Sequence, residues 1–180
     1  MEQNVAKRVP YGIQDFVQVI EQNCYYVDKT TYIPKLEDCP NNLFCIRPRR
    51  FGKSVFLSML HAYYDCRTKD KFQEWFGDLW IGKHPTPLQG RYQVMHLDFS
   101  QVGGSIENLE EKFNFYLGVQ LNGFIRDYLD FYSEKVQKQV EDAKDAGVKL
   151  AIIQSEARSK GYPLYLIIDE YDNFTNTVLN

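Results

Sequence analysis

The sequence lacks the features that mark membrane, secreted and zinc-binding proteins. Its longest apolar runs, such as residues 164–168, are far too short to cross a bilayer, and no charged start precedes a secretory apolar core. Four cysteines stand at irregular spacings without a C-x-x-C pair, so neither a zinc site nor a disulfide framework is indicated. We therefore expect a cytoplasmic protein that makes no use of a membrane.

An excess of positive charge is also absent. A formal net charge of -3 and a pI near 5.6 argue against a basic surface that coats nucleic acid, although they leave room for a local patch. The 180 residues are 44% hydrophobic and 15% aromatic, which is enough to bury a sizeable core. With no repeat, low-complexity tract or linker in the sequence, we expect one domain.

Apolar runs and helical periodicity alternate along the chain. Strands are predicted at residues 43–46, 92–99 and 164–168. Helices are predicted at residues 12–22, from a cap at Thr30 or Thr31 to residue 36, from Ser54 onward, at 72–80, and from 106 to about 140 with a second stretch to 158. The turn residues 161–163 end the last helix. Strands separated by helices predict a parallel α/β sheet.

A phosphate-binding motif follows the first predicted strand. Residues 47–54 read Arg-Pro-Arg-Arg-Phe-Gly-Lys-Ser, which matches G-x-x-x-x-G-K-[ST] except that Arg47 replaces the first glycine. Gly52 lets the backbone approach the phosphates, and the amides at the helix start point at the anion. Lys53 then reaches the β- and γ-phosphates, and the Ser54 hydroxyl is a ligand of Mg²⁺.

The neighbours of this tripeptide complete the predicted cofactor-binding set, which comprises Arg49, Arg50, Phe51, Gly52, Lys53, Ser54 and Val55. Arg49 and Arg50 have three open readings. They contact the γ-phosphate, bind the carboxylates of a partner, or lie solvated on the loop.

An acidic pair follows the last predicted strand. Asp169 is expected to hold Mg²⁺ through water, while Glu170 orients and polarises the attacking water as a general base. Glu170 and Lys53 are thus the predicted catalytic residues, and ATP and Mg²⁺ the cofactors. The alternative for the pair is a solvated acidic strand end. Asp98 ends the middle strand at the same edge, where it supports the metal or caps the following turn.

At these motifs the chain resembles the AAA-ATPase-like proteins common in gut and other anaerobic bacteria. The likeness covers most of the chain and lies in residues 10–16, 26–30, 47–54, 96–100 and 167–172. The resemblance implies that Arg47 is a family trait. It also implies that full-length relatives continue into the rest of the ATPase core and then a nuclease-like domain of the PD-(D/E)XK type.

The expected fold is therefore α/β, a P-loop NTPase-type parallel sheet flanked by helices and truncated after the Walker B strand. A sheet usually has about five strands, and only three are identifiable. Residues 1–180 are expected to be the N-terminal part of an AAA-ATPase-like domain. Within it, 1–42 form a helical segment and 43–180 an incomplete nucleotide-binding core.

The predicted function is a Mg-ATP-binding ATPase-like module that couples nucleotide binding or hydrolysis to a protein partner, to self-association or to the missing C-terminal domain. Turnover by this chain alone is expected to be weak or absent, and nucleic acid is reached only through the missing domain. A non-catalytic nucleotide-sensing or interaction scaffold is the alternative from another class. A P-loop kinase is a third reading, although the acidic pair favours water as the nucleophile.

Overall fold

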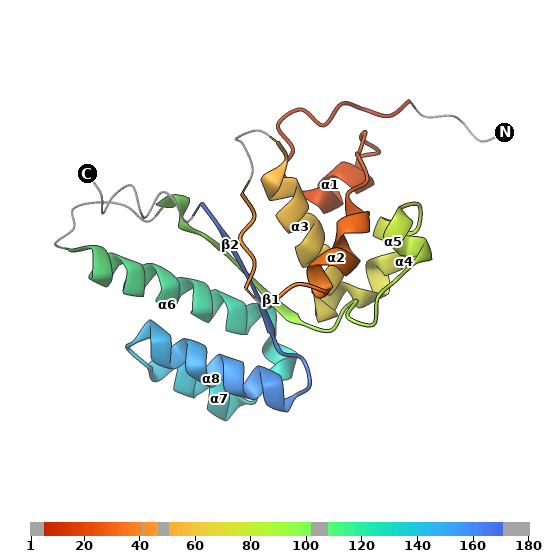
Figure 1. Cartoon of the computed structure of the whole chain (residues 1–180). Coiled ribbons are helices and arrows are strands. Elements are labelled where there is room, and N and C mark those ends of the chain that lie inside the picture. Colours follow the sequence, from red (N-terminus) through yellow and green to blue (C-terminus); the bar gives the residue numbers. More distant parts are fainter. Residues whose placement is uncertain (1–5, 41, 47–50, 102–107, 171–180) are drawn as a thin grey trace. The chain divides into compact units, whose positions relative to one another are not determined.

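The computed structural model describes residues 6–40, 42–46, 51–101 and 108–170. The chain divides into two compact units, residues 1–90 and 91–180 (Figure 1). Among the described residues, none of the helices combines the length and apolar character needed to cross a bilayer.

The first unit is built of short helices. Its elements are α1 (Phe16–Glu21), the 3-10 helix η1 (Thr30–Tyr32), α2 (Ile33–Glu37), α3 (Lys53–Tyr64), the 3-10 helix η2 (Cys66–Lys71), α4 (Phe72–Phe76) and α5 (Trp80–Lys83). The helix predicted at 72–80 begins as predicted but ends at Phe76, and α5 starts separately at Trp80. The helix predicted at 12–22 begins only at Phe16, because the Asp15 carboxylate accepts a hydrogen bond from the Gln18 amide at 2.8 Å and caps it there.

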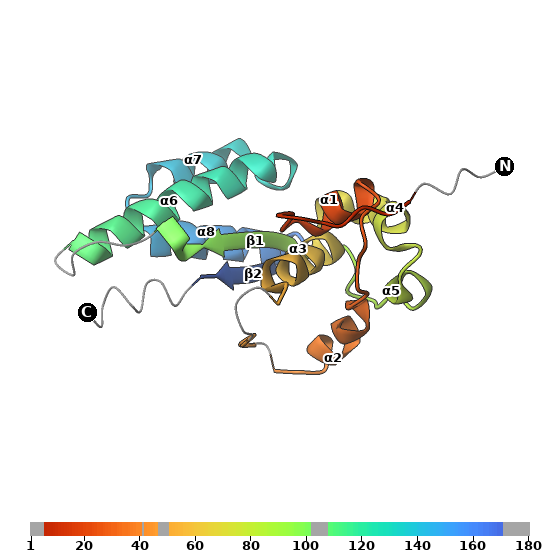
Figure 2. The same cartoon turned by 90° about the horizontal axis from the view of Figure 1, so that it is seen from above.

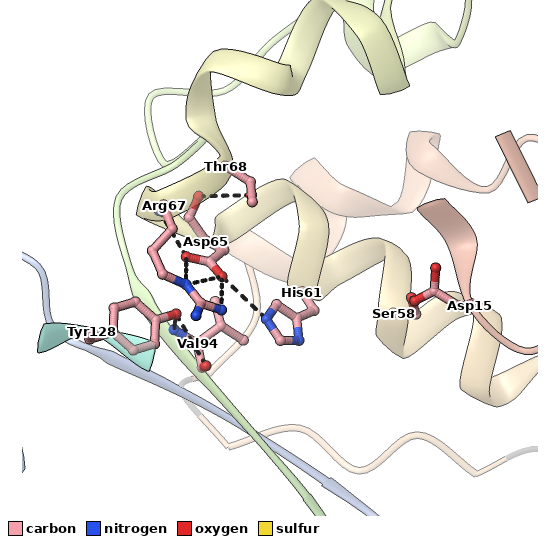
Figure 3. Close-up of polar contacts among 8 residues, drawn as sticks. All are labelled: Asp15, Ser58, His61, Asp65, Arg67, Thr68, Val94 and Tyr128. Carbon is pink, nitrogen blue, oxygen red and sulfur yellow. Dashed lines mark hydrogen bonds and ion pairs between the residues drawn. The ribbon is translucent and has the colours of Figure 1, made fainter. Parts of the chain in front are cut away.

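Asp15 also fixes α1 to α3. The Ser58 hydroxyl on α3 donates to the second carboxylate oxygen of Asp15 at 2.7 Å (Figure 3). The Phe16 amide donates to that hydroxyl at 3.0 Å. Phe16 is fully buried and stacks on Phe76 of α4 with 4.9 Å between the ring centroids. One polar triad and one aromatic contact thus join three helices.

The predicted helix cap at Thr30 or Thr31 is wrong. Thr30 is the first residue of η1, and its amide and hydroxyl both donate to Asp28 Oδ1, at 2.8 and 2.7 Å. No side chain caps α2 at its N-terminus. Thr30 is buried, and its hydroxyl oxygen also accepts from the Ile81 amide at 3.2 Å. Thr30 therefore fixes the start of α5.

The strand predicted at residues 43–46 is also wrong. These residues have no strand conformation, and Phe44 and Ile46 are 79% and 87% exposed. Sheet pairing among the described residues joins two other segments, besides an isolated bridge between Arg8 and Cys24. A short apolar run forms a strand only where a neighbouring strand satisfies its backbone groups, and its own composition does not supply that neighbour.

The second unit contains a parallel strand pair with helices in the crossover. Strands β1 (Gln93–Asp98) and β2 (Leu164–Asp169) pair in register from Gln93 opposite Leu164 to Asp98 opposite Asp169. Between them lie η3 (Phe99–Gln101), α6 (Leu109–Asp127), η5 (Leu129–Phe131), α7 (Glu134–Asp142) and α8 (Ala146–Ser159). The two strands predicted here and the mixed α/β class are confirmed.

The crossover helices pack on one another and on the sheet. Helix α8 lies against both α6 and α7 and contacts β2 (Figures 1 and 2). Buried Leu121, Phe124 and Ile153 supply apolar side chains from α6 and α8. The long helical region predicted from residue 106 is interrupted at η5. Tyr128 lies between α6 and η5. Its hydroxyl accepts from the Val94 amide and donates to the Val94 carbonyl of β1 (Figure 3).

The end of α8 is the one helix stop that the sequence predicts in detail. Gly161 has φ 76°, a left-handed conformation that glycine adopts without steric cost. Its amide donates to the Arg158 carbonyl, and the Tyr162 amide donates to the Ala157 carbonyl, both at 3.1 Å. These two bonds form a Schellman motif. The chain then passes Pro163 and enters β2.

A buried lysine joins the three crossover helices. Lys149 of α8 is 5% exposed, and its ammonium donates to Asn122 Oδ1 of α6 at 3.0 Å and to the Val140 and Glu141 carbonyls of α7. The last carbonyls of a helix have no partner within it and carry its negative dipole end. Lys149 therefore satisfies the C-terminus of α7 from a neighbouring helix.

A buried carboxylate joins the end of α3 to the start of η2. Asp65 is 1% exposed and accepts from the Arg67 amide at 2.8 Å, from the Arg67 guanidinium at 2.8 to 3.3 Å, and from His61 Nε2 at 3.3 Å (Figure 3). Burial acts to raise the pKa of Asp65, but the bonds from His61 and Arg67 and the Arg67 charge together outweigh it. The pKa of Asp65 therefore lies below its ordinary value.

Asp65→Asn should lower the free energy of unfolding by about 2 kcal/mol, because it removes charge-assisted bonds at a buried site. The Asp65 carboxylate stabilises the fold above its unfolded pKa of about 3.9, and this stabilisation is lost as the pH falls through the lower folded pKa. Urea unfolding between pH 3 and pH 7 measures both effects. Asp70→Asn, at an exposed site of η2, is the control. Equal stability and equal pH dependence in the two variants would contradict this role of Asp65.

Lys149→Met should also lower the free energy of unfolding by about 2 kcal/mol. Methionine retains most of the length of the side chain but leaves the α7 carbonyls and the Asn122 oxygen without their donor. Lys160→Met is the matched control, because Lys160 is half exposed and its ammonium forms a long ion pair with Glu156 at 3.8 Å. That change should cost less than about 0.5 kcal/mol. Urea unfolding of both variants compares them directly, and equal losses would exclude the proposed role of Lys149.

Candidate functional site

The predicted phosphate-binding residues lie at the first turn of α3. Gly52 precedes the helix with φ 73° and ψ 33°, in the left-handed region, and no side chain caps the helix start. Lys53, Ser54 and Val55 follow as the first three helical residues, and all three side chains are half-buried. The backbone therefore presents a helix N-terminus, with its positive dipole end, directly after a glycine.

The rest of α3 holds this turn in place. The helix buries an apolar stripe at the i, i+3, i+4, i+7 and i+8 spacing, which comprises Phe56, Met59, Leu60, Tyr63 and Tyr64. Complete burial of one such side chain contributes about 1.5 to 3 kcal/mol. The Phe56 amide donates to the Gly52 carbonyl at 3.1 Å and closes the first turn. The position of Gly52 is thus fixed by a helix that is anchored over its whole length.

A second lysine approaches this turn from another segment. Lys29 Nζ lies 3.3 Å from the point that a Cβ atom at Gly52 would occupy. Lys29 is half-buried and immediately precedes η1. Sequence reasoning did not assign a role to Lys29. The available signal was its place in the Tyr26 to Thr30 motif, on which part of the family resemblance rests.

The remaining predicted loop residues give less information. Phe51 is 65% exposed beside Gly52. Arg49 and Arg50 lie outside the described residues, as do Arg47 and Pro48. The three readings of the two arginines therefore stay predictions.

The predicted acidic pair lies in the second unit, at the end of β2. Asp169 is 6% exposed, and its Oδ1 accepts from the Glu170 amide at 2.9 Å. Glu170 has φ 53°, a left-handed conformation that is uncommon for residues other than glycine. Backbone strain of this kind is concentrated at functional sites in proteins. The reading of this pair as a solvated strand end is wrong for Asp169, which is buried.

Asp98 ends β1 opposite Asp169 in the sheet register. Its carboxylate accepts from the Ser100 amide at 2.8 Å, and its backbone carbonyl accepts from the Tyr116 hydroxyl. The turn-capping alternative for Asp98 is therefore confirmed. The two strand-end aspartates belong to one unit and the α3 turn to the other.

Ser54 in the first unit and Asp169 in the second carry oxygen donors of the kinds that Mg²⁺ takes in proteins. Mg²⁺ is usually held in nucleotide sites by one or two protein oxygens, with phosphate oxygens and water completing the octahedron. Ser54 and Asp169 would supply a hydroxyl and a carboxylate. In the described part of the chain, no group of three or more His, Cys, Asp or Glu side chains forms a metal site of its own.

Comparison with known proteins gives a family and one distant relative. A family described as "Predicted AAA-ATPase" matches residues 10–180. The chain is also 27% identical over 172 residues to an uncharacterized protein in the vnfD 5′ region of Azotobacter chroococcum mcd 1, an alignment that covers 92% of this chain. The chain spans 29% of the length of that relative. No solved structure matches this chain.

The family match extends from the Pro10 motif past the acidic pair at the end of β2, so it includes the α3 turn of the first unit and the acidic pair of the second. The chain belongs to the AAA-ATPase-like family.

Proposed function

We propose that the chain is the nucleotide-binding part of a P-loop ATPase, in which the first turn of α3 holds the phosphates of Mg-ATP. The observation that carries the proposal is left-handed Gly52, directly before Lys53 and Ser54, at a helix start that no side chain caps. Such a turn offers backbone amides and a positive dipole end to an anion. The family description supports ATP as the nucleotide.

Each residue of the proposed phosphate site has a distinct role. Lys53 would contact the β- and γ-phosphates, and the Ser54 hydroxyl and the Asp169 carboxylate would be the protein ligands of the metal ion. A bound Mg²⁺ would supply positive charge that neutralises the phosphate oxygens. Phe51 and Val55 flank the amides of the turn, where their backbone rather than their side chains takes part.

Glu170 is the proposed general base. Its carboxylate accepts a proton from water as the water oxygen bonds to the γ-phosphorus and the bond between that phosphorus and ADP breaks. The products are ADP and inorganic phosphate. The left-handed backbone of Glu170 supports this role, because uncommon backbone conformations of this kind are concentrated at functional sites.

The proposed output is control of another domain or protein. The chain spans 29% of the length of its Azotobacter relative, so most of that relative lies outside the aligned part. Binding or hydrolysis of ATP would then shift the conformation of an attached domain, a protein partner or a second copy. A P-loop NTPase-type sheet extended by further strands is the fold that this proposal requires.

Lys53→Ala should weaken Mg-ATP binding by about tenfold to a hundredfold, because a cation that bonds to phosphate contributes about 1.5 to 3 kcal/mol. Isothermal titration calorimetry of the wild type and the variant measures the change. Lys83→Ala removes the same charge from an exposed site of α5 in the same unit and should leave the affinity unchanged. Equal binding by Lys53→Ala and the wild type would contradict a phosphate site here, and it would favour the non-catalytic scaffold.

Glu170→Gln in the full-length protein should retain Mg-ATP binding and slow hydrolysis by about a hundredfold or more, the usual contribution of a general base. Release of inorganic phosphate under saturating ATP measures the rate. Glu156→Gln on α8 is the control, since the Glu156 carboxylate lies 3.8 Å from the ammonium of Lys160 in a surface ion pair. Unchanged hydrolysis in Glu170→Gln would remove Glu170 from the mechanism without affecting the phosphate site.

A further inference from the structure

Lys29 is placed beside Gly52 by residues on both sides of it in the sequence. Asp28 Oδ2 accepts from the Trp80 amide of α5 at 2.8 Å, while its Oδ1 accepts from the amide and hydroxyl of Thr30. Thr30 in turn accepts from the Ile81 amide at 3.2 Å. The residues before and after Lys29 are therefore both anchored at the start of one helix, which fixes the backbone of the lysine between them.

The side chain of Lys29 extends from this anchored backbone to the phosphate-binding turn. Its ammonium lies 3.3 Å from the Cβ position of residue 52, so glycine at that position leaves room for it. A side chain at residue 52 would meet this ammonium in addition to the strain of a φ of 73°. Gly52 thus permits two features at once, the left-handed turn and the approach of a second cation.

This placement is electrostatically unfavourable without an anion. The N-terminus of α3 carries a positive partial charge, and Lys53 begins the helix. A further ammonium at the same turn is repelled by the positive end of the helix dipole. An anionic ligand reverses the sign of the effect, because triphosphate places several negative charges where the helix start and the Lys29 ammonium lie together.

We propose that Lys29 is a second phosphate-binding cation of the nucleotide site, which contacts the phosphates that lie over Gly52 and Lys53. This inference rests on the proposed function, since it assigns a further residue to the same Mg-ATP site. Asp28 and Thr30 are positioning residues that hold Lys29 through the two amides of α5. The Val-Asp-Lys-Thr segment thereby forms part of the nucleotide site although it precedes α3 by more than twenty positions in the sequence.

The test compares Lys29→Gln, Lys29→Arg, Lys53→Ala and Lys83→Gln with the wild type. Each chain is titrated with Mg-ATP by calorimetry, and its melting temperature is measured without nucleotide and with saturating Mg-ATP. Lys29→Gln removes the charge and keeps most of the side chain, whereas Lys29→Arg keeps the charge. Lys83→Gln removes an equal charge elsewhere in the same unit.

Lys29→Gln is expected to weaken Mg-ATP binding about tenfold. Its melting temperature without nucleotide should equal or exceed that of the wild type, because repulsion at the α3 turn is relieved. Lys29→Arg should recover most of the affinity, and Lys83→Gln should bind as the wild type does. A structural role for Lys29 would instead lower the melting temperature without nucleotide.

Three results would overturn the inference, and they can be distinguished from one another. If Lys53→Ala loses binding while Lys29→Gln binds as the wild type does, the phosphate site stands and Lys29 is outside it. If Lys29→Gln melts earlier without nucleotide and Lys29→Arg does not restore binding, Lys29 is structural. If the wild type itself does not bind Mg-ATP, the proposed function fails and the role of Lys29 fails with it.

Discussion

The left-handed conformation of Gly52 is the constraint on which the proposed site depends. It turns the chain into α3, so that the amides and the positive dipole end of the helix directly follow a residue without a side chain. The apolar stripe of α3 and the Asp15 to Ser58 hydrogen bond hold that helix in the first unit. The same glycine leaves space for the Lys29 ammonium. Backbone geometry and charge therefore meet at one residue that has no side chain.

The second unit shows a similar combination of a rigid support and a strained end. Parallel pairing with β1 and the Schellman motif at Gly161 determine where β2 begins, and the strand ends in buried Asp169 and left-handed Glu170. Carboxyl ends of parallel strands are where ligands of open α/β sheets bind. The proposed chemistry uses residues at the ends of regular elements, at the start of α3 and at the end of β2, and regular elements position such residues better than long loops do.

Local signals predicted much of this structure. The β-rich composition of residues 164–168 and the turn residues after α8 act over a few positions, and the predicted strand and helix stop are both confirmed. Interactions across the sequence were not predictable in this way. Thr30 was expected to cap a helix, but its hydroxyl accepts from the Ile81 amide of α5 about fifty positions later. Residues 43–46 are not paired with a neighbouring strand, although their composition favours one. Lys149 and Lys29 carry no periodic signal, because their roles depend on which segments pack beside them.

The most direct test of the central claim is a two-dimensional amide NMR titration of the full chain with Mg-ATP. A parallel titration with adenosine and the same magnesium concentration is the reference. The account predicts that the Gly52, Lys53 and Ser54 amide signals shift progressively with ATP and remain in place with adenosine, because the phosphates bind at the start of α3. Shifts confined to other residues, or no shifts at millimolar ATP, would contradict the account and leave α3 as an ordinary helix of the first unit.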